Sequence, residues 1–371
     1  MKAIKVFFGT LLCLAALVLT AGLLAILLLF PSGKTLPRGE RAYDLASQYD
    51  KNMQNRLLDA ISGITAVKKT YWIPEDAPAA PMPDGDCFGR TEDPSMLQWV
   101  LEKAQEVLEG QTLFFTPDAE LLPGSQVNYY LDETILALTW KQEIDNMAIT
   151  FAEVKVMDPS QFRRYLSGNE FASGKLMLTT EMSQTVNAVV ACSGDYYGYR
   201  PDGSVVIGGK VMRNSLALPD TCYIDENGDM ILRRREFFRS QEEAQAFVDE
   251  HHIRFSLAFG PILVLDGEVC PLYSYSIGEV NQNYARAGLG QLDRCHYLYV
   301  ACNQEGNTQT TNIGRFARLM KDCGCVQAYN LDGGQTATVV MRDQVINQVN
   351  YGSQRRISDI IYFATAKPGK E

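Results

Sequence analysis

The sequence predicts an α+β fold with a mixed β-sheet core and a few packing helices. We expect this core to follow an N-terminal transmembrane helix and a helical or extended accessory segment. Three observations lead to this prediction: residues 6–30 carry no charge, β-branched and alternating patterns dominate after residue 112, and the few helical patterns are irregularly placed among the strands. Irregular placement favours α+β over a strictly alternating α/β order.

The composition predicts a folded protein that does not bind nucleic acid. With 371 residues, 46% of them hydrophobic, the chain can bury one sizeable core and a smaller accessory unit. The formal charge of -10 at pH 7 argues against nucleic acid or acidic lipid as a partner, because both would repel the average surface. A local basic pocket is compatible with that average.

The N-terminal segment predicts a membrane anchor. The uncharged run at 6–30 is longer than the roughly 20 residues that cross a bilayer as a helix. A cleavable signal peptide, the alternative, has an apolar core of only about 7 to 15 residues. We therefore expect residues 1–31 to form a cytoplasmic tip and a single membrane span, with the body of the protein outside the cytoplasm.

Residues 32–140 are expected to form an accessory region. A polar helical pattern covers 39–64, and prolines interrupt 71–89, which indicates an extended segment. A helix then follows, because Asp93 suits an N-cap, Pro94 suits the first helical position, and apolar residues recur at helical spacing after them.

The main domain is expected over 141–371. Glycine-containing turns at 208–209, 227–228 and 266–267 lie between apolar runs and predict β-hairpins. A capping box at 240–243 predicts one helix among them.

Cysteine and histidine usage does not indicate a metal centre. Of the nine cysteines, only Cys13 lies in the uncharged run, so an even number remains for disulfides in an oxidising compartment; buried free thiols are the alternative. Cys323 and Cys325 lack the two-residue spacer of a zinc knuckle, and the chain has three histidines. We predict no cofactor, and metal dependence stays open.

The most informative polar motif follows a predicted helix. The helical pattern at 311–321 ends at Gly324, which suits a left-handed cap, so a strand should follow. In that strand Asn330 and Asp332 flank Leu331, and alternation places both polar side chains on one face.

A flexible turn comes next. Gly333 and Gly334 allow a sharp bend and close approach to a ligand, and the amides after them, with the hydroxyls of Thr336 and Thr338, could surround an anion. Beside Asp332 this pattern indicates an active site. The alternative is a hairpin in which the Asp-Gly pair only makes a tight turn.

A second carboxylate accompanies a glycine at another predicted strand end. Ser193, Gly194 and Asp195 follow an apolar run, and three tyrosines and Arg200 come next. The tyrosines suit either the core or a platform for a sugar ring, since aromatic faces serve both purposes. For Asp195, the alternative to catalysis is a loop cap.

Four motifs follow one another along the chain: Ser193–Tyr197, Phe259–Pro261 before Leu265-Asp-Gly, Arg286–Gly290, and Asn330–Gly334. Because these motifs occur in the same order in the phosphodiester glycosidase family, the chain from about Asn187 onward resembles that family. That family includes the enzyme that removes N-acetylglucosamine from mannose phosphate, and bacterial surface proteins associated with exopolysaccharide metabolism.

The chain departs from the family pattern at three places. Ser193 stands where relatives commonly have Asn, residues 335–337 replace Gly-Ser-Ser, and Asn303-Gln304-Glu305 replaces Asp-Gly-Arg. A carboxylate and a guanidinium that could hold sugar or phosphate are therefore missing, which leaves the substrate open.

The resemblance implies a hydrolase that cleaves a sugar from a glycosyl phosphodiester, in cell-envelope or exopolysaccharide metabolism. Such cleavage passes through an oxocarbenium-like state that carboxyl groups stabilise, and we take Asp195 and Asp332 as the candidate pair. Arg286 could hold two phosphate oxygens, although a surface ion pair is its alternative role. The other candidate substrate-binding residues are Ser193, Gly194, Arg200, Asn330, Gly333, Gly334 and Thr336.

We expect Asp195, Arg286 and Asp332 to line one pocket. The expected partners are a glycosyl phosphodiester or envelope glycan, and the membrane. The alternative function is a noncatalytic module on the same fold that binds glycans or assembles envelope components.

Overall fold

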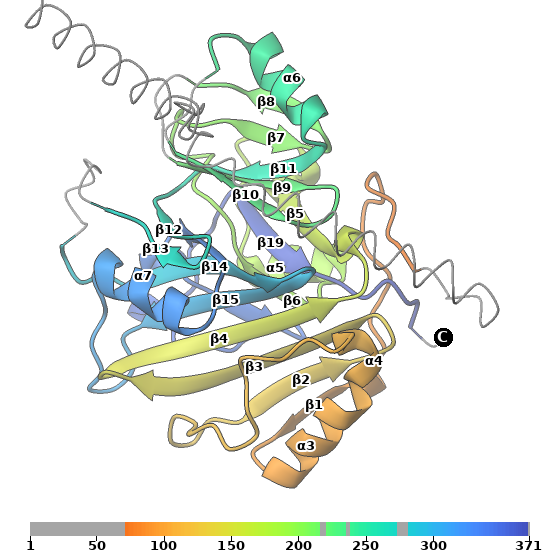
Figure 1. The fold of residues 1–371 in the computed structure, drawn as a ribbon, viewed down its shortest axis with the longest axis vertical. Helices are drawn as coiled ribbons and strands as arrows, with labels where there is room; N and C mark the ends of the chain where they lie inside the picture. Colours follow the sequence, from red (N-terminus) through yellow and green to blue (C-terminus); the bar gives the residue numbers. More distant parts are fainter. Residues whose placement is uncertain (1–70, 216–219, 235–237, 273–280, 370–371) are drawn as a thin grey trace, which may run out of the picture. The chain divides into compact units, whose positions relative to one another are not determined.

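The computed structural model describes residues 71–215, 220–234, 238–272 and 281–369. In this part of the chain three β-sheets dominate, every strand pair within them is antiparallel, and the α-helices have at most ten residues (Figure 1). The predicted α+β class with a mixed sheet is therefore wrong, and the fold is mostly β. The helices each cover part of a sheet face and do not form a layer of their own.

Two sequence predictions lie outside the described residues: the transmembrane helix at 6–30 and the helical pattern at 39–64. Within the described ranges, none of the helices combines the length and the apolar character that crossing a membrane requires.

The largest sheet has nine strands in the order β1-β2-β3-β4-β15-β14-β16-β12-β13. Its strands are β1 (Phe88–Thr91), β2 (Val127–Leu131), β3 (Ile135–Ile144), β4 (Met147–Val156), β15 (His296–Asn303), β14 (Arg286–Asp293), β16 (Gln327–Leu331), β12 (Ile262–Leu265) and β13 (Glu268–Val269). β1, β2 and most of β3 lie within 32–140, which we expected to form a helical and extended accessory region, although strand-like patterns were expected after residue 112. Local pattern could not reveal β1, because it pairs with β2, which lies about 40 residues further along the chain.

Two five-stranded sheets complete the fold, in the orders β10-β9-β11-β7-β8 and β18-β17-β6-β19-β5. Their strands are β10 (Met230–Arg233), β9 (Thr221–Asp225), β11 (Ile253–Leu257), β7 (Val205–Ile207), β8 (Lys210–Arg213), β18 (Gln344–Val345), β17 (Val339–Met341), β6 (Val190–Ser193), β19 (Asp359–Phe363) and β5 (Phe162–Leu166).

The helices lie between these strands in the sequence. They are α3 (Pro94–Lys103), α4 (Gln105–Leu108), α5 (Thr179–Val186), α6 (Gln241–Glu250) and α7 (Ile313–Asp322), with 3-10 turns η1 (Gly85–Cys87), η2 (Pro159–Gln161), η3 (Ser167–Asn169), η4 (Gly334–Thr336) and η5 (Asn350–Gly352). As predicted, Asp93 caps α3 by accepting a hydrogen bond from the Ser95 amide, and Gly324 after α7 has a left-handed φ of 84°.

The nine-stranded sheet forms a central layer. Leu136, Leu138 and Trp140 of β3 pack with α3, α4 and α7 on one face. The alternate residues Ile135 and Ala137 point to the opposite face, where they pack with both five-stranded sheets. Side chains alternate along a strand, so one strand supplies both cores.

Each five-stranded sheet also has a covering helix. Phe247 and Val248 of α6 pack on the sheet that contains β9, and Met182 and Val186 of α5 pack on the sheet that contains β19. The central strands β9, β6 and β19 are buried along their whole length, which explains why their sequences do not alternate between apolar and polar residues.

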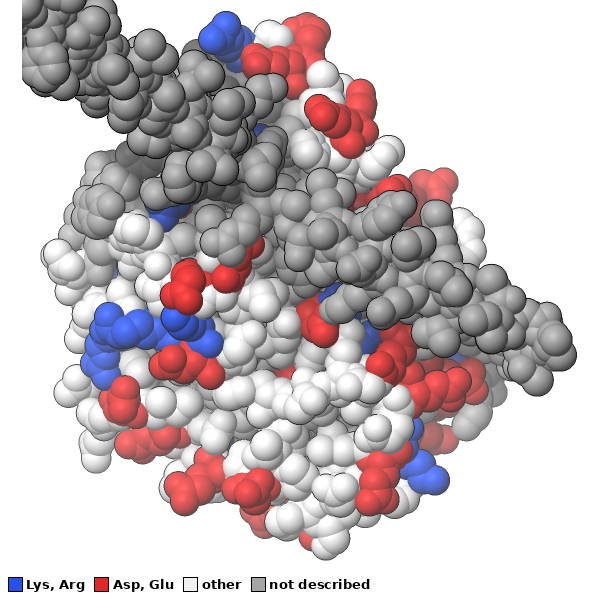
Figure 2. Space-filling view, viewed as in Figure 1, with Lys and Arg blue, Asp and Glu red and all other residues white. Residues whose placement is uncertain are grey.

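The three hairpins predicted from glycine turns are confirmed. β7 pairs with β8, β9 with β10, and β12 with β13, and each pair is joined at the expected turn. Figure 2 shows Asp and Glu side chains spread over the face viewed, with one group of Lys and Arg side chains over α7.

Candidate active site

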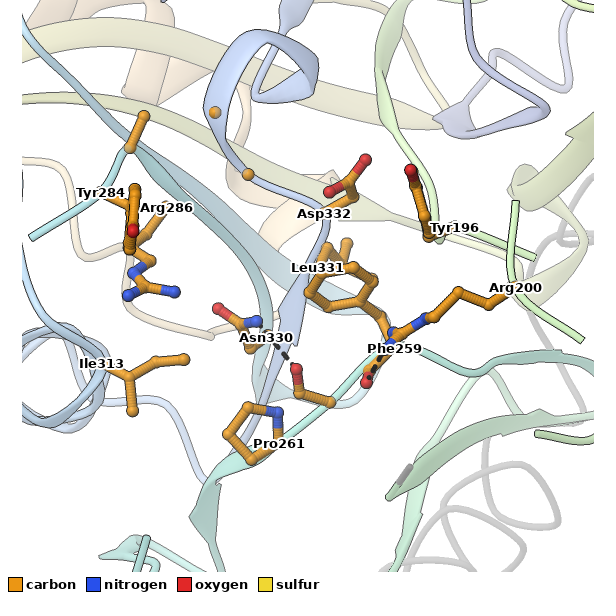
Figure 3. A pocket seen from close by; sticks show the side chains of 14 residues that line it. Tyr196, Arg200, Phe259, Pro261, Tyr284, Arg286, Ile313, Asn330, Leu331 and Asp332 are labelled. Atoms are coloured by element: carbon orange, nitrogen blue, oxygen red, sulfur yellow. Dashed lines mark hydrogen bonds between the residues drawn. The ribbon is translucent and has the colours of Figure 1, made fainter. Parts of the chain in front are cut away.

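A cavity of about 360 Å³ lies where β14 begins and β16 ends (Figure 3). Its wall is formed by Tyr196, Arg200, Phe259, Gly260, Pro261, Tyr284, Ala285, Arg286, Ile313, Asn330, Leu331, Asp332, Gly333 and Gly334. Among the residues predicted from the sequence, it therefore brings together Arg200, Arg286, Asn330, Asp332, Gly333 and Gly334. The remaining predicted residues, Ser193, Gly194, Asp195 and Thr336, do not line it.

Strand register brings the backbones of Arg286 and Asp332 together. β14 and β16 pair antiparallel with Ala287 opposite Leu331, so the two chains leave the pair at Arg286 and Asp332, and both residues line the pocket. A Cβ on Gly333 would lie 2.3 Å from the carbonyl oxygen of Ala285, so only glycine allows the two chains to pass this closely.

The Asp332 side chain lies half-buried at the pocket wall, with its Oδ2 atom buried. Burial raises its pKa from 3.8 to about 6, while the nearby Thr336 side chain and the charges of Arg355 and Arg200 act in the opposite direction. Its Oδ2 is buried without a hydrogen-bond partner in the described structure. Near neutral pH the site therefore holds a carboxyl group that changes charge easily and has an oxygen left for a ligand.

The turn after Asp332 uses its polar groups internally. The amide of Gly334 donates to the Ala285 carbonyl oxygen at 2.9 Å, and the Thr336 hydroxyl donates to the Gly333 carbonyl oxygen at 2.6 Å. These two donors hold the turn against β14, and the expectation that the amides of this turn, with the hydroxyls of Thr336 and Thr338, surround an anion stays a prediction.

Arg286 is held in a fixed position. Its side chain is only 7% exposed, its guanidinium donates to the carbonyl oxygens of Thr311 and Gln282 at 3.3 and 3.0 Å, and it lies 5.4 Å from the centre of the Tyr284 ring. A surface ion pair, the alternative role considered from the sequence, does not fit this burial. The pocket thus contains an ordered guanidinium that can meet a planar anion.

Asn330 presents an acceptor to the same pocket. Its Nδ2 donates to the Gly260 carbonyl oxygen at 2.9 Å, the bond drawn in Figure 3, and its buried Oδ1 has no partner in the described structure. A buried amide oxygen of this kind can accept a hydrogen bond from a sugar hydroxyl group.

Asp195 does not join Arg286 and Asp332 in the pocket. One of its oxygens lies 2.9 Å from Nη2 of Arg164 and accepts from the Tyr197 amide, and the other accepts from the Ala258 amide at 2.8 Å. The expectation that all three side chains share the pocket therefore holds for two of them. These contacts match the loop-cap alternative, since Asp195 ties its own loop to the segment after β11.

A buried charge cluster lies behind this wall, formed by Arg164, Asp195 and Asp359. Nε of Arg164 donates to Asp359 at 2.8 Å, and burial raises the pKa of Asp359 to about 7 although Arg164 lowers it. Gly194 makes room for it, because a Cβ there would lie 2.1 Å from an Asp359 oxygen. Sequence reasoning missed Arg164 and Asp359; the available signal was a charged residue within or at the edge of an apolar strand.

The tyrosines near Asp195 divide between the two roles left open by the sequence. Tyr197 is a core residue, 6% exposed and stacked on Phe171. Tyr196 and Tyr199 stack on each other at 4.5 Å between ring centres, and Tyr196 lines the pocket. They support a further arginine that the sequence did not single out, Arg355, whose guanidinium lies 4.7 Å from the Tyr199 ring centre.

The residues that depart from the family pattern have structural contacts. Ser193 is buried and shares a hydrogen bond of 2.9 Å with the Tyr299 hydroxyl. The Asn303 side chain accepts from Asn347 at 2.8 Å, and Glu305 pairs with Lys141 at 2.7 Å. None of these three side chains lines the pocket.

The described residues contain no group of three or more His, Cys, Asp or Glu side chains arranged to hold a metal ion. The seven cysteines from Cys192 to Cys325 are free thiols, and all seven are buried.

Comparison with known proteins confirms the resemblance noted from the sequence. Residues 186–364 match the phosphodiester glycosidase family. The catalytic domain of zebrafish N-acetylglucosamine-1-phosphodiester alpha-N-acetylglucosaminidase, described as auto-inhibited by its pro-peptide, is similar with a TM-score of 0.51 and 17% identity, over 62% of this chain and 83% of that one. At this identity the likeness shows a shared fold.

A hypothetical protein from Synechocystis is similar with a TM-score of 0.46 and 13% identity, over 67% of this chain and 64% of that one. No curated protein sequence matches the chain.

Proposed function

We propose, from the match of residues 186–364 to the phosphodiester glycosidases, which are hydrolases, that this protein hydrolyses the bond between sugar and phosphate in a glycosyl phosphodiester. The observation that carries the proposal is the half-buried Asp332 carboxyl group, which faces the same cavity as the guanidinium of Arg286.

In this reaction water adds to the anomeric carbon, and the bond from that carbon to the phosphate oxygen breaks. The phosphate monoester leaves with the bonding electrons, and the sugar is released with a new hydroxyl group. The transition state resembles an oxocarbenium ion. Ionised Asp332 stabilises its positive charge and accepts the proton that the attacking water loses.

Arg286 holds the phosphate. Its position across the strand pair from Asp332 suits a substrate whose sugar lies at the carboxylate and whose phosphate lies at the guanidinium. A phosphate monoester leaves readily, so neutralising its charge contributes more than protonating it. Asn330 can accept a hydrogen bond from the sugar through its unpartnered oxygen.

Asp195 is a positioning residue in this proposal. Its bonds to Arg164 and to the amide of Ala258 fix the segment that continues into Phe259, Gly260 and Pro261 of the pocket wall. Its oxygens are used in those contacts, so one carboxyl group, that of Asp332, acts on the substrate.

The test is release of free sugar from a panel of sugar-1-phosphodiesters by the full-length protein. We expect turnover by the parent and by Asp322→Asn, which changes an exposed carboxylate at the end of α7, and almost none by Asp332→Asn. Absence of turnover on the whole panel would refute the hydrolase, and ligand binding without turnover would favour the glycan-binding module.

The uncharged run at 6–30 holds the protein at a membrane in this proposal, with the body outside the cytoplasm, where cell-envelope glycans or exopolysaccharides supply the substrate. Protease added to intact cells should cleave the body. Full protection in cells whose envelope admits the protease would contradict this location.

A further inference from the structure

A group of cationic and aromatic side chains borders the pocket on the side away from Arg286. We call Tyr196, Tyr199, Arg200 and Arg355 the arginine–tyrosine platform. The Tyr196 and Tyr199 rings are nearly parallel, at 17°, and the Arg355 guanidinium lies 5.4 Å from the first ring centre and 4.7 Å from the second. Arg200 lies 4.6 Å from the ring centre of Phe259, which lines the same wall.

The two arginines keep most of their hydrogen-bonding capacity. Arg200 donates to the Phe259 carbonyl oxygen at 3.2 Å, and Arg355 donates to the Tyr196 hydroxyl at 3.3 Å. A guanidinium has five N–H donors, and neither side chain forms an ion pair with a carboxylate in the described part of the chain. Stacking therefore fixes both planes while leaving N–H edges for a ligand.

The segment that carries Arg355 is also fixed at two points. Gln335, in the turn after Asp332, donates to the carbonyl oxygen and the hydroxyl of Ser353 at 3.0 and 3.2 Å. The Tyr199 hydroxyl donates to the Arg356 carbonyl oxygen at 2.8 Å. Arg355 therefore lies between two anchors that connect it to the catalytic turn and to the stacked tyrosines.

The charge around the pocket is opposite to that of the whole protein. The chain carries -10 at pH 7, yet Arg200, Arg286 and Arg355 gather around a single pocket carboxyl group, Asp332. Figure 3 shows Arg286 and Arg200 on opposite sides of Asn330 and Asp332. Such separated positive groups attract an anion at each end.

We propose that the platform is a second anion subsite. The substrate is accordingly a glycosyl phosphodiester with an additional phosphate or carboxylate group, which Arg200 and Arg355 bind while Arg286 holds the phosphodiester. This inference rests on the proposed function of the pocket, and it narrows the substrate class to polyanionic glycosyl phosphates.

The test compares the affinities of the full-length protein for three groups of ligands that keep the sugar–phosphate bond of the substrate but lack its second alcohol. These are hexose 1-phosphates, hexose 1-phosphates with a second phosphate, and uronic acid 1-phosphates, measured by calorimetry. We expect the second anionic group to raise the affinity about 10-fold or more, the size of one charge-assisted hydrogen bond. Comparing the ligands that carry a second phosphate with the uronic acid 1-phosphates shows whether the platform prefers a phosphate or a carboxylate group.

Arg355→Gln and Arg200→Gln should each reduce the ratio of the two affinities, with and without the second anionic group, toward 1. Arg356→Gln is the matched control, because it removes the same charge from the adjacent residue, which is exposed and pairs with Glu181. A ratio near 1 in the parent, or an unchanged ratio in Arg355→Gln, would overturn the subsite. Affinity ratios need no turnover, so a failure in the sugar-release assay would refute the hydrolase separately.

Discussion

Replacing Asp332 by Asn should lower the catalytic rate and raise the folding stability at neutral pH. The side chain keeps its size and one carbonyl oxygen but can no longer ionise. In the folded protein, burial raises the pKa of Asp332 from 3.8 to about 6, so the folded state binds this proton more tightly than the unfolded state does. Ionisation above pH 6 therefore costs folding free energy, and the Asn variant avoids that cost.

The shift of roughly two pKa units corresponds to about 3 kcal/mol. The sign follows from the raised pKa: the stabilising contribution of Asp332 is fully present below pH 3.8, where both states bind the proton, and is lost as the pH rises through about 6. Asn also places an amide group where Oδ2 has no partner, which costs about 1 kcal/mol at every pH. The variant should thus gain about 2 kcal/mol relative to the parent between pH 4 and pH 7.5.

Thermal unfolding of both proteins at the two pH values measures this change, with an expected relative shift in Tm on the order of 5 °C. At pH 7.5 the turnover of Asp332→Asn should decrease by about 10³-fold or more, or about 4 kcal/mol, with ligand binding little changed. Equal Tm differences at both pH values would refute the buried-charge argument. Turnover like that of the parent would remove Asp332 from the catalytic residues and favour a purely turn-forming role.

Three further predictions follow from the site. The kcat/KM of the parent should increase with pH through about 6 as Asp332 ionises, and Arg355→Gln should move that midpoint to higher pH, because Arg355 lowers the pKa of Asp332; a midpoint that stays in place would contradict their coupling. Asp195→Asn should destabilise the protein by about 3 kcal/mol in urea unfolding, since it leaves a buried guanidinium with one carboxylate instead of two; a loss of rate at unchanged stability would instead indicate direct catalysis. Gly194→Ala should cost at least about 2 kcal/mol by the same measurement, because its Cβ would lie 2.1 Å from an oxygen of Asp359; a stability equal to that of the parent would show that the cluster can move aside.

Local chemistry in the sequence predicted local structure correctly. The Asn227-Gly228 turn joins β9 and β10, Asp93 caps α3, and Gly324 ends the helix before β16. Each depends on the conformational preferences of a few neighbouring residues, which the sequence states directly.

The fold class could not be obtained in the same way. The sequence pattern predicts strands after residue 112, and β4 is one of them, but its burial along the whole length between two cores does not indicate which strands pair with it. The pairing of β1 with β2 depends on contacts across a long connection. Helical patterns are easier to recognise than buried strands, which led to too large a helical share.

The candidate site shows the same division. Asp195 and Asp332 have similar local sequences, a carboxylate beside glycine at the end of a strand. Only the distant partners distinguish them, because Arg164 and Asp359 enclose the first while the second faces a cavity. A local motif could predict both carboxylates as site residues, but it could not show that Asp195 has a structural role and that Asp332 lines the pocket.

The position of β19 in its sheet affects how the protein can fold. This strand, residues Asp359–Phe363, lies between β6 and β5, and its partners in β5 are almost 200 residues earlier in the chain. During synthesis the gap between β5 and β6 must stay open until β19 has emerged, and pairing over such a separation is slow. The exposed edges of β5 and β6 are therefore where a chaperone, or a misfolded neighbour, would bind the unfinished protein.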